Sequence, residues 1–185
     1  VLTNQSKLLL TGASNKGISG TTTLDNEGTM TLENTGIISM SNSTINNRAL
    51  GTFNLSSDAG ISFASSPSHV LNNYGLLLRN VSSGTCNIGI TANNYGTIDA
   101  ATGTLNFGGV LNNTTTGIIK GNATIDLPSA ANFTNDGTFA PGGTPGKLTV
   151  IGAYESTGNA KLAIELNGLV PQTGHDWLAI EGNGI

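Results

Sequence analysis

Three consecutive units of the chain read TCNI and NYGTI (85–98), TLNF and NTTTGII (104–119), and TIDL and NDGTF (124–139). In each unit, a short strand with apolar side chains at every second position is followed by a turn of Asn and Gly and then by a second short strand. Such alternation buries one face of a strand and leaves the other in solvent. A repeat of about 20 residues is typical of a solenoid, whose units bury their apolar faces only by stacking on one another. We therefore predict a rod of stacked coils.

The composition of the 185-residue chain favours the same fold. Charged residues make up 10% of the chain and aromatic residues 5%, while Gly, Asn, Thr and Ser are abundant. These four residue types are poor helix formers and good turn formers, so the chain suits a thin core closed by many turns. We predict an all-β parallel β-solenoid of about seven coils, with almost no α-helix.

Aligning the first inward residue of each unit extends the repeat in both directions. We predict one core ladder formed by Leu8, Met30, Phe53, Cys86, Leu105, Ile125 and Leu148. Its steps are 19 to 23 residues long, except for one step of 33 residues from Phe53 to Cys86. Because that step exceeds a coil by about half, we predict an inserted loop or an irregular coil near 56–83, with turn-like stretches at 56–60 and 64–69.

The turns also repeat. Most have the form Asn-x-Gly, and the turn at 113–117 has the same form with two additional residues. The asparagines of this predicted turn ladder are Asn15, Asn34, Asn73, Asn94, Asn113 and Asn135. Stacked asparagines can hydrogen-bond from coil to coil as an amide ladder. Alternatively, Asn and Gly are present because they tolerate left-handed backbone angles in sharp turns. The sequence leaves both explanations open.

The pattern changes after residue 139. A turn cluster rich in Pro and Gly (140–146) precedes LTVIGAY (148–154), LAIELNG (162–168) and HDWLAIEG (175–182). This part resembles the recurrent C-terminal segment of autotransporter-type passenger domains, the pectin-lyase-like β-helix adhesins of bacterial surfaces. His175 departs from that pattern, which usually has Tyr there. The coils before residue 140 resemble the family more loosely.

The resemblance implies a right-handed parallel β-helix. It divides the chain into coils over 1–139 and a passenger-type segment over 140–185 that continues them. It also implies a secreted protein of the bacterial cell surface, a non-enzymatic adhesin or structural stalk with a role in cell adhesion and virulence. We expect the chain to be a piece of a longer protein whose export signal and anchor lie outside it.

The charges and side chains indicate which partners to expect. The net charge is −4, and the seven Lys and Arg residues are scattered singly, so we expect neither nucleic acid nor direct membrane insertion. We predict binding to a host or environmental glycan, to a protein surface or to another copy of the chain. Tyr74 and Tyr95 fall at one corner of neighbouring coils, and they are the best candidate binding residues. Cys86 occupies an inward position, so we predict a buried, inert thiol.

Other functions have weaker support. The carboxylates Asp25, Glu27, Glu33, Asp58, Asp99, Asp126 and Asp136 are better explained as a solvated surface than as a metal or acid–base site. His69 and His175 lack a matching nucleophile, so we expect no catalytic residues, no metal and no cofactor. A polysaccharide lyase or tailspike-like glycosidase is the alternative, by analogy of fold. An ice-binding solenoid is a third hypothesis: Thr-x-Thr occurs at 21–23 and 29–31, but the following coils have only single threonines at the strand starts, at Thr52, Thr85, Thr104 and Thr124.

Overall fold

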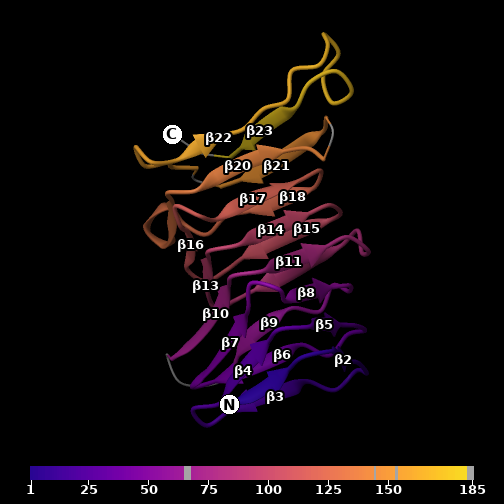
Figure 1. Cartoon of the computed structure of the whole chain (residues 1–185), viewed down its shortest axis with the longest axis vertical. Coiled ribbons are helices and arrows are strands. Elements are labelled where there is room, and N and C mark those ends of the chain that lie inside the picture. Colours follow the sequence, from indigo (N-terminus) through magenta and orange to yellow (C-terminus); the bar gives the residue numbers. More distant parts are fainter. Residues whose placement is uncertain (65–67, 144, 153, 183–185) are drawn as a thin grey trace.

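The computed structural model describes residues 1–64, 68–143, 145–152 and 154–182. The chain winds through three parallel sheets that form the three sides of a solenoid (Figure 1). Its two ends lie at opposite ends of the stack. The predicted all-β parallel solenoid of about seven coils is confirmed. The helical content of the described residues is the single 3-10 turn η1 (Ala130–Asn132). No helix among these residues is long and apolar enough to span a bilayer.

Each of the first seven coils contributes one strand to each sheet, in the order A, B, C, and the last turn adds a strand to sheets B and C. Sheet A contains β1 (Leu2–Asn4), β4 (Thr23–Asn26), β7 (Ser43–Asn47), β10 (His69–Asn73), β13 (Thr91–Asn94), β16 (Leu111–Asn113) and β19 (Phe133–Asn135). Sheet B contains β2 (Lys7–Leu10), β5 (Thr29–Leu32), β8 (Thr52–Leu55), β11 (Leu76–Arg79), β14 (Thr97–Ala100), β17 (Ile118–Gly121), β20 (Thr138–Pro141) and β22 (Lys161–Leu162). Sheet C contains β3 (Lys16–Ser19), β6 (Ile38–Ser41), β9 (Ile61–Phe63), β12 (Thr85–Ile88), β15 (Thr104–Phe107), β18 (Thr124–Asp126), β21 (Lys147–Ile151) and β23 (Trp177–Glu181).

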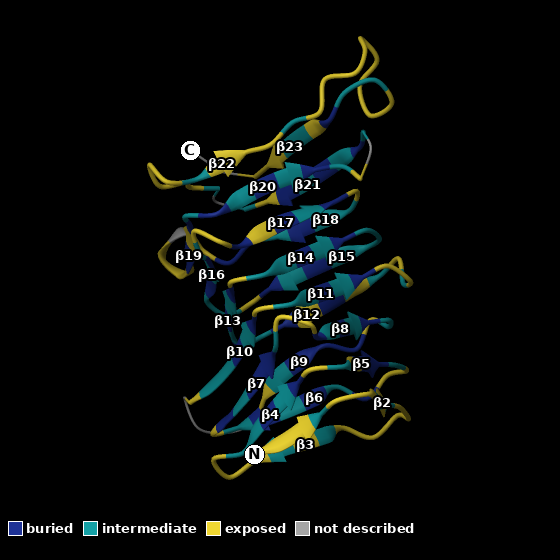
Figure 2. Ribbon diagram, viewed as in Figure 1, coloured by how far each residue is buried: buried dark blue, intermediate teal, exposed yellow. Residues whose placement is uncertain are grey.

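The core is a thin column enclosed by the three sheets (Figure 2). Strands alternate between buried and more exposed residues, as the sequence predicts for strands with one inward face. Inward residues of successive coils pair directly, for example Leu105 with Ile125 in sheet C. Burial is incomplete in the first described coil, where Leu8 and Ile18 are only partly buried.

The predicted single core ladder is wrong at the step from Phe53 to Cys86, because it moves there from one sheet to another. Leu8, Met30 and Phe53 do stack, but in sheet B, where Phe53 pairs with Leu77. Cys86 begins a separate run in sheet C with Leu105 and Ile125. Sheets B and C use similar strands of the form Thr-x-Asn-x, so a list with one strand per coil can change sheets unnoticed.

Two further corrections concern the same ladder. Ile125 pairs with Val150, whereas Leu148 pairs with Leu178 one coil later. The insertion predicted near 56–83 is also an effect of the change of sheet, because this region holds the ordinary strands β9, β10 and β11. Its coil is still the longest, with 26 residues between equivalent asparagines against 19 to 22 elsewhere. Residues 65–67 of the predicted turn at 64–69 lie outside the described residues.

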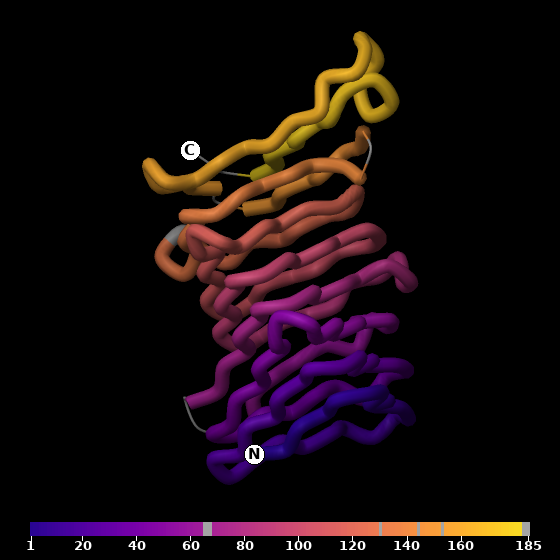
Figure 3. Tube along the Cα trace, in the orientation of Figure 1, coloured from indigo at the N-terminus to yellow at the C-terminus, as the bar shows by residue number. Residues whose placement is uncertain are grey.

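The segment from 140 onward continues the stack. Strand β21 pairs with β18 in sheet C, and β22 pairs with β20 in sheet B, but sheet A ends at β19. Beyond β22 the chain leaves the coils and projects as a loop before returning in β23 (Figure 3). Asp176 stabilises the base of this loop. Its carboxylate accepts hydrogen bonds from the backbone N–H groups of Gly146 and Glu165, each at 2.8 Å.

Candidate functional site

The corner between sheets A and B is the most regular part of the surface. At this A/B corner, each sheet A strand ends in an asparagine, and the next residue points outward along one edge of the solenoid. From the first coil to the seventh, the residues that follow the asparagines are Gln5, Glu27, Arg48, Tyr74, Tyr95, Thr114 and Asp136. An asparagine repeated in every coil therefore supports an outer column whose residues differ from coil to coil.

The interior of the corner is an amide ladder. The Nδ2 group of each asparagine donates to the Oδ1 atom of the next, at 2.7–2.8 Å, in the order Asn4, Asn26, Asn47, Asn73, Asn94, Asn113 and Asn135. From Asn26 to Asn135 these side chains are fully or almost fully buried. The last asparagine donates to Ser156 Oγ at 3.1 Å, which ends the ladder.

The ladder also ties one sheet to another. In the first five asparagines, Nδ2 makes a second hydrogen bond to a backbone carbonyl at the start of the sheet B strand in the following coil, as Asn94 does to Ile118 at 3.1 Å. Both amide hydrogens of each of these asparagines are therefore used, as burial requires. A second, outer ladder runs beside the first through Asp25, Asn46, Asn72, Asn93 and Asn112, at 2.8–2.9 Å.

The predicted turn ladder is correct for four of its six asparagines. Asn73, Asn94, Asn113 and Asn135 belong to the buried ladder, but Asn15 and Asn34 lie at the corner between sheets B and C. Asn34 has φ 62°, so there the alternative explanation by left-handed backbone angles holds.

The prediction also missed three members of the ladder, Asn4, Asn26 and Asn47. Asn26 stands in an Asn-x-Gly triplet. Asn47 and Gly51 repeat the longer spacing of Asn113 and Gly117, so the sequence carried a signal for both.

The glycines of the A/B corner have a different role from the one predicted. Gly75 and Gly96 do not have positive φ values. A Cβ atom on Gly96 would lie 2.3 Å from the carbonyl oxygen of Gly75 in the coil below, and one on Gly75 would lie 2.2 Å from that of Gly51. Glycine is needed here because successive coils approach one another too closely for a side chain.

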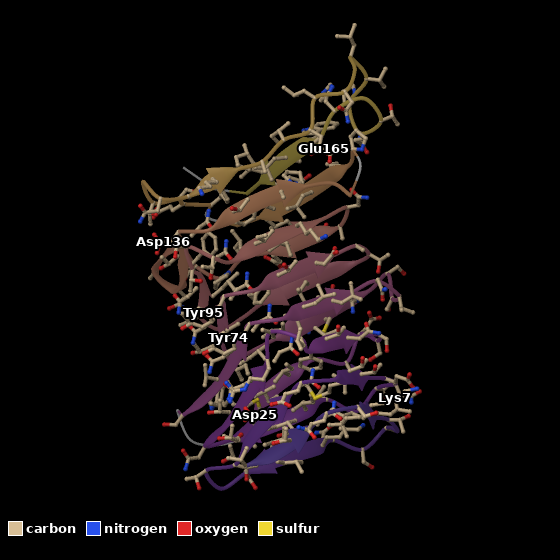
Figure 4. The ribbon with its side chains drawn as sticks, in the orientation of Figure 1. Lys7, Asp25, Tyr74, Tyr95, Asp136 and Glu165 are labelled. Atoms are coloured by element: carbon tan, nitrogen blue, oxygen red, sulfur yellow. The ribbon has the colours of Figure 1, made fainter. Side chains whose placement is uncertain are left out.

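Tyr74 and Tyr95 lie in neighbouring coils, as predicted, and their rings are stacked (Figure 4). The ring centroids are 4.7 Å apart, with 9° between the planes, and each residue is 39% exposed. Because the rings cover each other on one face, a ligand meets their edges and their remaining faces. The pair is thus a rigid, preorganised aromatic patch.

A shallow groove adjoins this patch on the outer side of sheet B. It is lined by Ala49, Leu50, Gly51, Thr52, Tyr74, Gly75, Leu76, Gly96, Thr97 and Lys120. Leu50 is 91% exposed and adds an apolar side chain to the start of the groove.

A second corner of the solenoid, between sheets B and C, contains a buried charge. The Arg79 side chain is completely buried at a position that pairs with Ala100. Its guanidinium donates to Asp58 Oδ1 at 2.6 Å and to the carbonyls of Ser57 and Gly84. Asp58 is half-exposed, and hydrogen bonds from Ser82 and Arg79 lower the pKa of its carboxyl.

Cys86 is buried beside this charge pair, at the inward position that pairs with Leu105. Its Sγ atom lies 3.0 Å from the carbonyl oxygen of Ala59. Burial raises the pKa of the thiol to about 11, so the group is protonated at neutral pH. Its low reactivity stays a prediction, now with a structural reason.

The carboxylates do not converge on one site. Asp25 pairs with Arg48 at 2.8 Å and Asp99 with Lys120 at 3.3 Å, both as surface ion pairs. Asp99 lies in sheet B and Asp126 in sheet C, on different sides of the solenoid. Among the described residues, no group of three or more His, Cys, Asp or Glu side chains is placed to hold a metal ion.

The two histidines, His69 and His175, also lie in different parts of the molecule. His69 stacks on Phe63 at 5.1 Å in the body of the solenoid, and His175 contacts the Gly168 carbonyl in the projecting loop.

Threonine residues form one aligned column on the outer face of sheet C. Thr85, Thr104, Thr124 and Thr149 pair in register on four consecutive coils. The neighbouring outward column contains Asn87, Asn106, Asp126 and Ile151, so the paired Thr-x-Thr rows of a regular threonine face do not form.

The comparisons with known proteins leave the fold and this geometry as the basis for assigning a function. No protein-family model, curated protein or solved structure matches the chain.

Proposed function

We propose that the chain is a rod-like segment of a secreted bacterial surface adhesin or structural stalk, and that it acts through its surface without catalysis. The observation that carries the proposal is the buried amide ladder along one edge of the stack. Buried amides that join each coil to the next, and in five coils also join sheet A to sheet B, favour a stiff rod. A stiff rod holds whatever lies beyond it at a distance from the cell.

The surface supports binding along the rod rather than in a deep active site. Outward positions are mostly hydroxyl and amide side chains, interrupted by the aromatic patch of Tyr74 and Tyr95. The partner would be a glycan or a protein surface outside the cell, or a second copy of the chain. The resemblance of residues 140–182 to passenger domains supports the same role and an extracellular location.

A polysaccharide-active enzyme would need a different arrangement. Glycosidases of the usual kind place two carboxylates about 5 to 10 Å apart across the substrate. Here Asp99 is paired with Lys120 in sheet B, whereas Asp126 lies in sheet C. The test is a glycan-array screen combined with a sugar-release assay on the bound glycans. We expect binding without release; release of sugar would favour a lyase or a glycosidase instead.

Ice binding is a second candidate, favoured by the threonine column on four consecutive coils of sheet C. The column is single, and Asn or Asp fills the next outward position in three of the four coils. We expect thermal-hysteresis and ice-recrystallisation assays to show no activity. Activity that is lost in Thr104→Leu would assign this function in place of adhesion.

A further inference from the structure

We propose that the groove beside Tyr74 binds an extended, uncharged oligosaccharide that lies along the axis of the solenoid. This inference rests on the proposed function and gives it a site and a ligand class. The groove begins at Leu50 in the third coil, passes Leu76 and Thr97, and ends at Lys120 in the sixth. It therefore runs across coils rather than along one strand.

The shape of the groove comes from the lengths of the corner turns. The turns at 47–51 and 113–117 have five residues, and each contains one internal hydrogen bond of 2.8 Å. In the first turn, the Gly51 N–H group donates to the Arg48 carbonyl; in the second, the Gly117 N–H group donates to the Thr114 carbonyl. The two turns between them, at 73–75 and 94–96, have three residues. The corner is therefore set back over two coils and bounded by longer turns on both sides. Each of these two short turns carries one of the stacked tyrosines, which lie next to each other at this corner (Figure 4).

The floor of the recess is backbone. Gly75 and Gly96 line the groove without a side chain, and neither can be replaced by a larger residue without a clash with the coil below. Leu50, Leu76 and the edge of the Tyr74 ring supply apolar surface, which suits the C–H faces of a sugar ring. Thr52 and Thr97 supply hydroxyl groups that both donate and accept hydrogen bonds, as sugar hydroxyls do.

The charges around the groove favour a neutral ligand. Lys120 is paired with Asp99 at 3.3 Å, and Arg48, next to the start of the groove, is paired with Asp25 at 2.8 Å. Neither cation is free to neutralise an acidic sugar without losing its present partner. The groove therefore offers hydrogen bonding and apolar contact with balanced charge.

The dimensions favour a glycan over a folded protein. Adjacent coils of a parallel solenoid are about 4.8 Å apart, close to the length of one sugar residue in an extended chain. A groove across four coils thus accommodates about three sugar residues. Stable protein partners usually cover about 800 Å² on each side. The ten residues that line this narrow groove provide a smaller surface than that.

The test is calorimetric titration of the chain with uncharged β-linked di- to hexasaccharides of glucose, xylose and N-acetylglucosamine, with hexagalacturonate as the acidic probe. We expect at least one neutral series to bind, with affinity rising to about the trisaccharide or tetrasaccharide and then levelling off. Thr97→Glu and Leu50→Ala should each weaken binding about tenfold. The matched control Thr124→Glu changes an outward threonine of sheet C and should leave affinity unchanged, as should Phe63→Ala, which removes an exposed aromatic ring elsewhere. Circular dichroism checks that every variant is folded.

The other outcomes overturn the groove and separate it from the proposed function. Binding that is equal in Thr97→Glu and Thr124→Glu, preference for hexagalacturonate, or capture of a protein in place of sugar would reject the groove but leave the adhesin role standing. If the unaltered chain binds neither oligosaccharides nor cell surfaces, the adhesin role fails together with the groove.

Discussion

The A/B corner and the B/C corner contain the same sequence motif but are stabilised in different ways. At the A/B corner, Asn-x-Gly places a buried amide in an uninterrupted ladder, and the glycine allows close contact between coils. At the B/C corner, Asn34 is exposed, has φ 62° and donates to Thr11, while a later coil uses the buried Arg79 and Asp58 instead. The asparagine ladder of the A/B corner requires the same residue in every coil, whereas the separate contacts of the B/C corner allow different residues in different coils. The difference predicts that equivalent substitutions at the two corners have unequal effects.

The largest effect is expected at the charge pair of the B/C corner. Asp58→Ala removes the only carboxylate that contacts the fully buried Arg79 guanidinium, among the described residues. An unpaired buried charge typically costs about 3–5 kcal/mol in the free energy of unfolding. In an Arg79→Met background the same change should cost less than about 0.5 kcal/mol, because no buried charge is left. Denaturant unfolding of the four proteins measures this coupling.

Cys86 provides an independent readout of the same corner. Its thiol lies against Ala59, one residue from Asp58, and is buried with a pKa raised to about 11. A thiol reagent should label the unaltered protein slowly and Asp58→Ala much faster, with the slow rate restored in the double variant. Equal cost of Asp58→Ala in both backgrounds would show that the ion pair does not hold this corner.

The next largest effect is expected in the amide ladder. Asn94→Ala deletes two donated hydrogen bonds and leaves one of the two N–H donors of the buried Asn73 Nδ2 group without an acceptor. Buried unsatisfied groups cost about 1–3 kcal/mol each, so we expect a loss of about 2–3 kcal/mol. Asn34→Ala is the matched change at the other corner, where the left-handed backbone opposes alanine and one exposed hydrogen bond to Thr11 is lost, at a total of about 1 kcal/mol. Asn34→Gly should be neutral, whereas Asn94→Gly should be at least as harmful as alanine. Equal losses for both asparagines would contradict the distinction between the corners.

Glycine substitutions sharpen the same comparison. Gly96→Ala places a Cβ atom against the Gly75 carbonyl and forces adjacent coils apart, at an expected cost of about 1–3 kcal/mol. Gly17→Ala, in the triplet of Asn15 at the B/C corner, meets nothing within 4 Å and does not have a positive φ. It should be neutral or slightly stabilising, because alanine restricts the unfolded chain. Thermal unfolding followed by circular dichroism distinguishes these results.

The sequence predicts the solenoid well because alternation and period are properties of every coil. It predicts sheet membership poorly, because strands such as 52–55 in sheet B and 85–88 in sheet C follow the same Thr-x-Asn-x pattern. The asparagine ladder was partly visible: Asn26 carries the triplet, but Asn4 is followed by Gln5 and Ser6 and has no glycine. Contacts between coils decide to which sheet a strand belongs and which asparagines join the ladder. The local sequence pattern alone does not predict these contacts.

The functional candidates show the same limit. The alternation of Leu77 and Arg79 points both side chains inward, yet an arginine in a core column contradicts its usual exposure. Only the structure supplies Ser57, Asp58 and Gly84 as partners. Tyr74 and Tyr95 were found from their equivalent positions alone, whereas the groove depends on Leu50, whose turn had not been aligned with the others.

The smallest expected effect concerns the one charge in the outer ladder of the A/B corner. Asp25 occupies the position held by Asn46, Asn72, Asn93 and Asn112 in later coils, and Arg48 above all lowers the pKa of its carboxyl, helped by Asn46 and opposed by burial. A carboxyl with a lowered pKa stabilises the fold above its unfolded pKa of about 3.9, and this contribution disappears as the pH falls through the folded value. Asp25→Asn should therefore cost about 0.5 kcal/mol at pH 7, where the ion pair with Arg48 is lost, and less at pH 3.

The measurement is the difference in unfolding free energy between the unaltered protein and Asp25→Asn across that pH range. Asp58, whose carboxyl pKa is also lowered, titrates in both proteins and cancels in the difference. A difference that stays constant down to pH 3 would mean that the carboxylate contributes no more than an amide does. In that case Asp25 would stabilise the fold no more than the asparagines at the equivalent positions of later coils, and its ion pair with Arg48 would not contribute to the stability of the A/B corner.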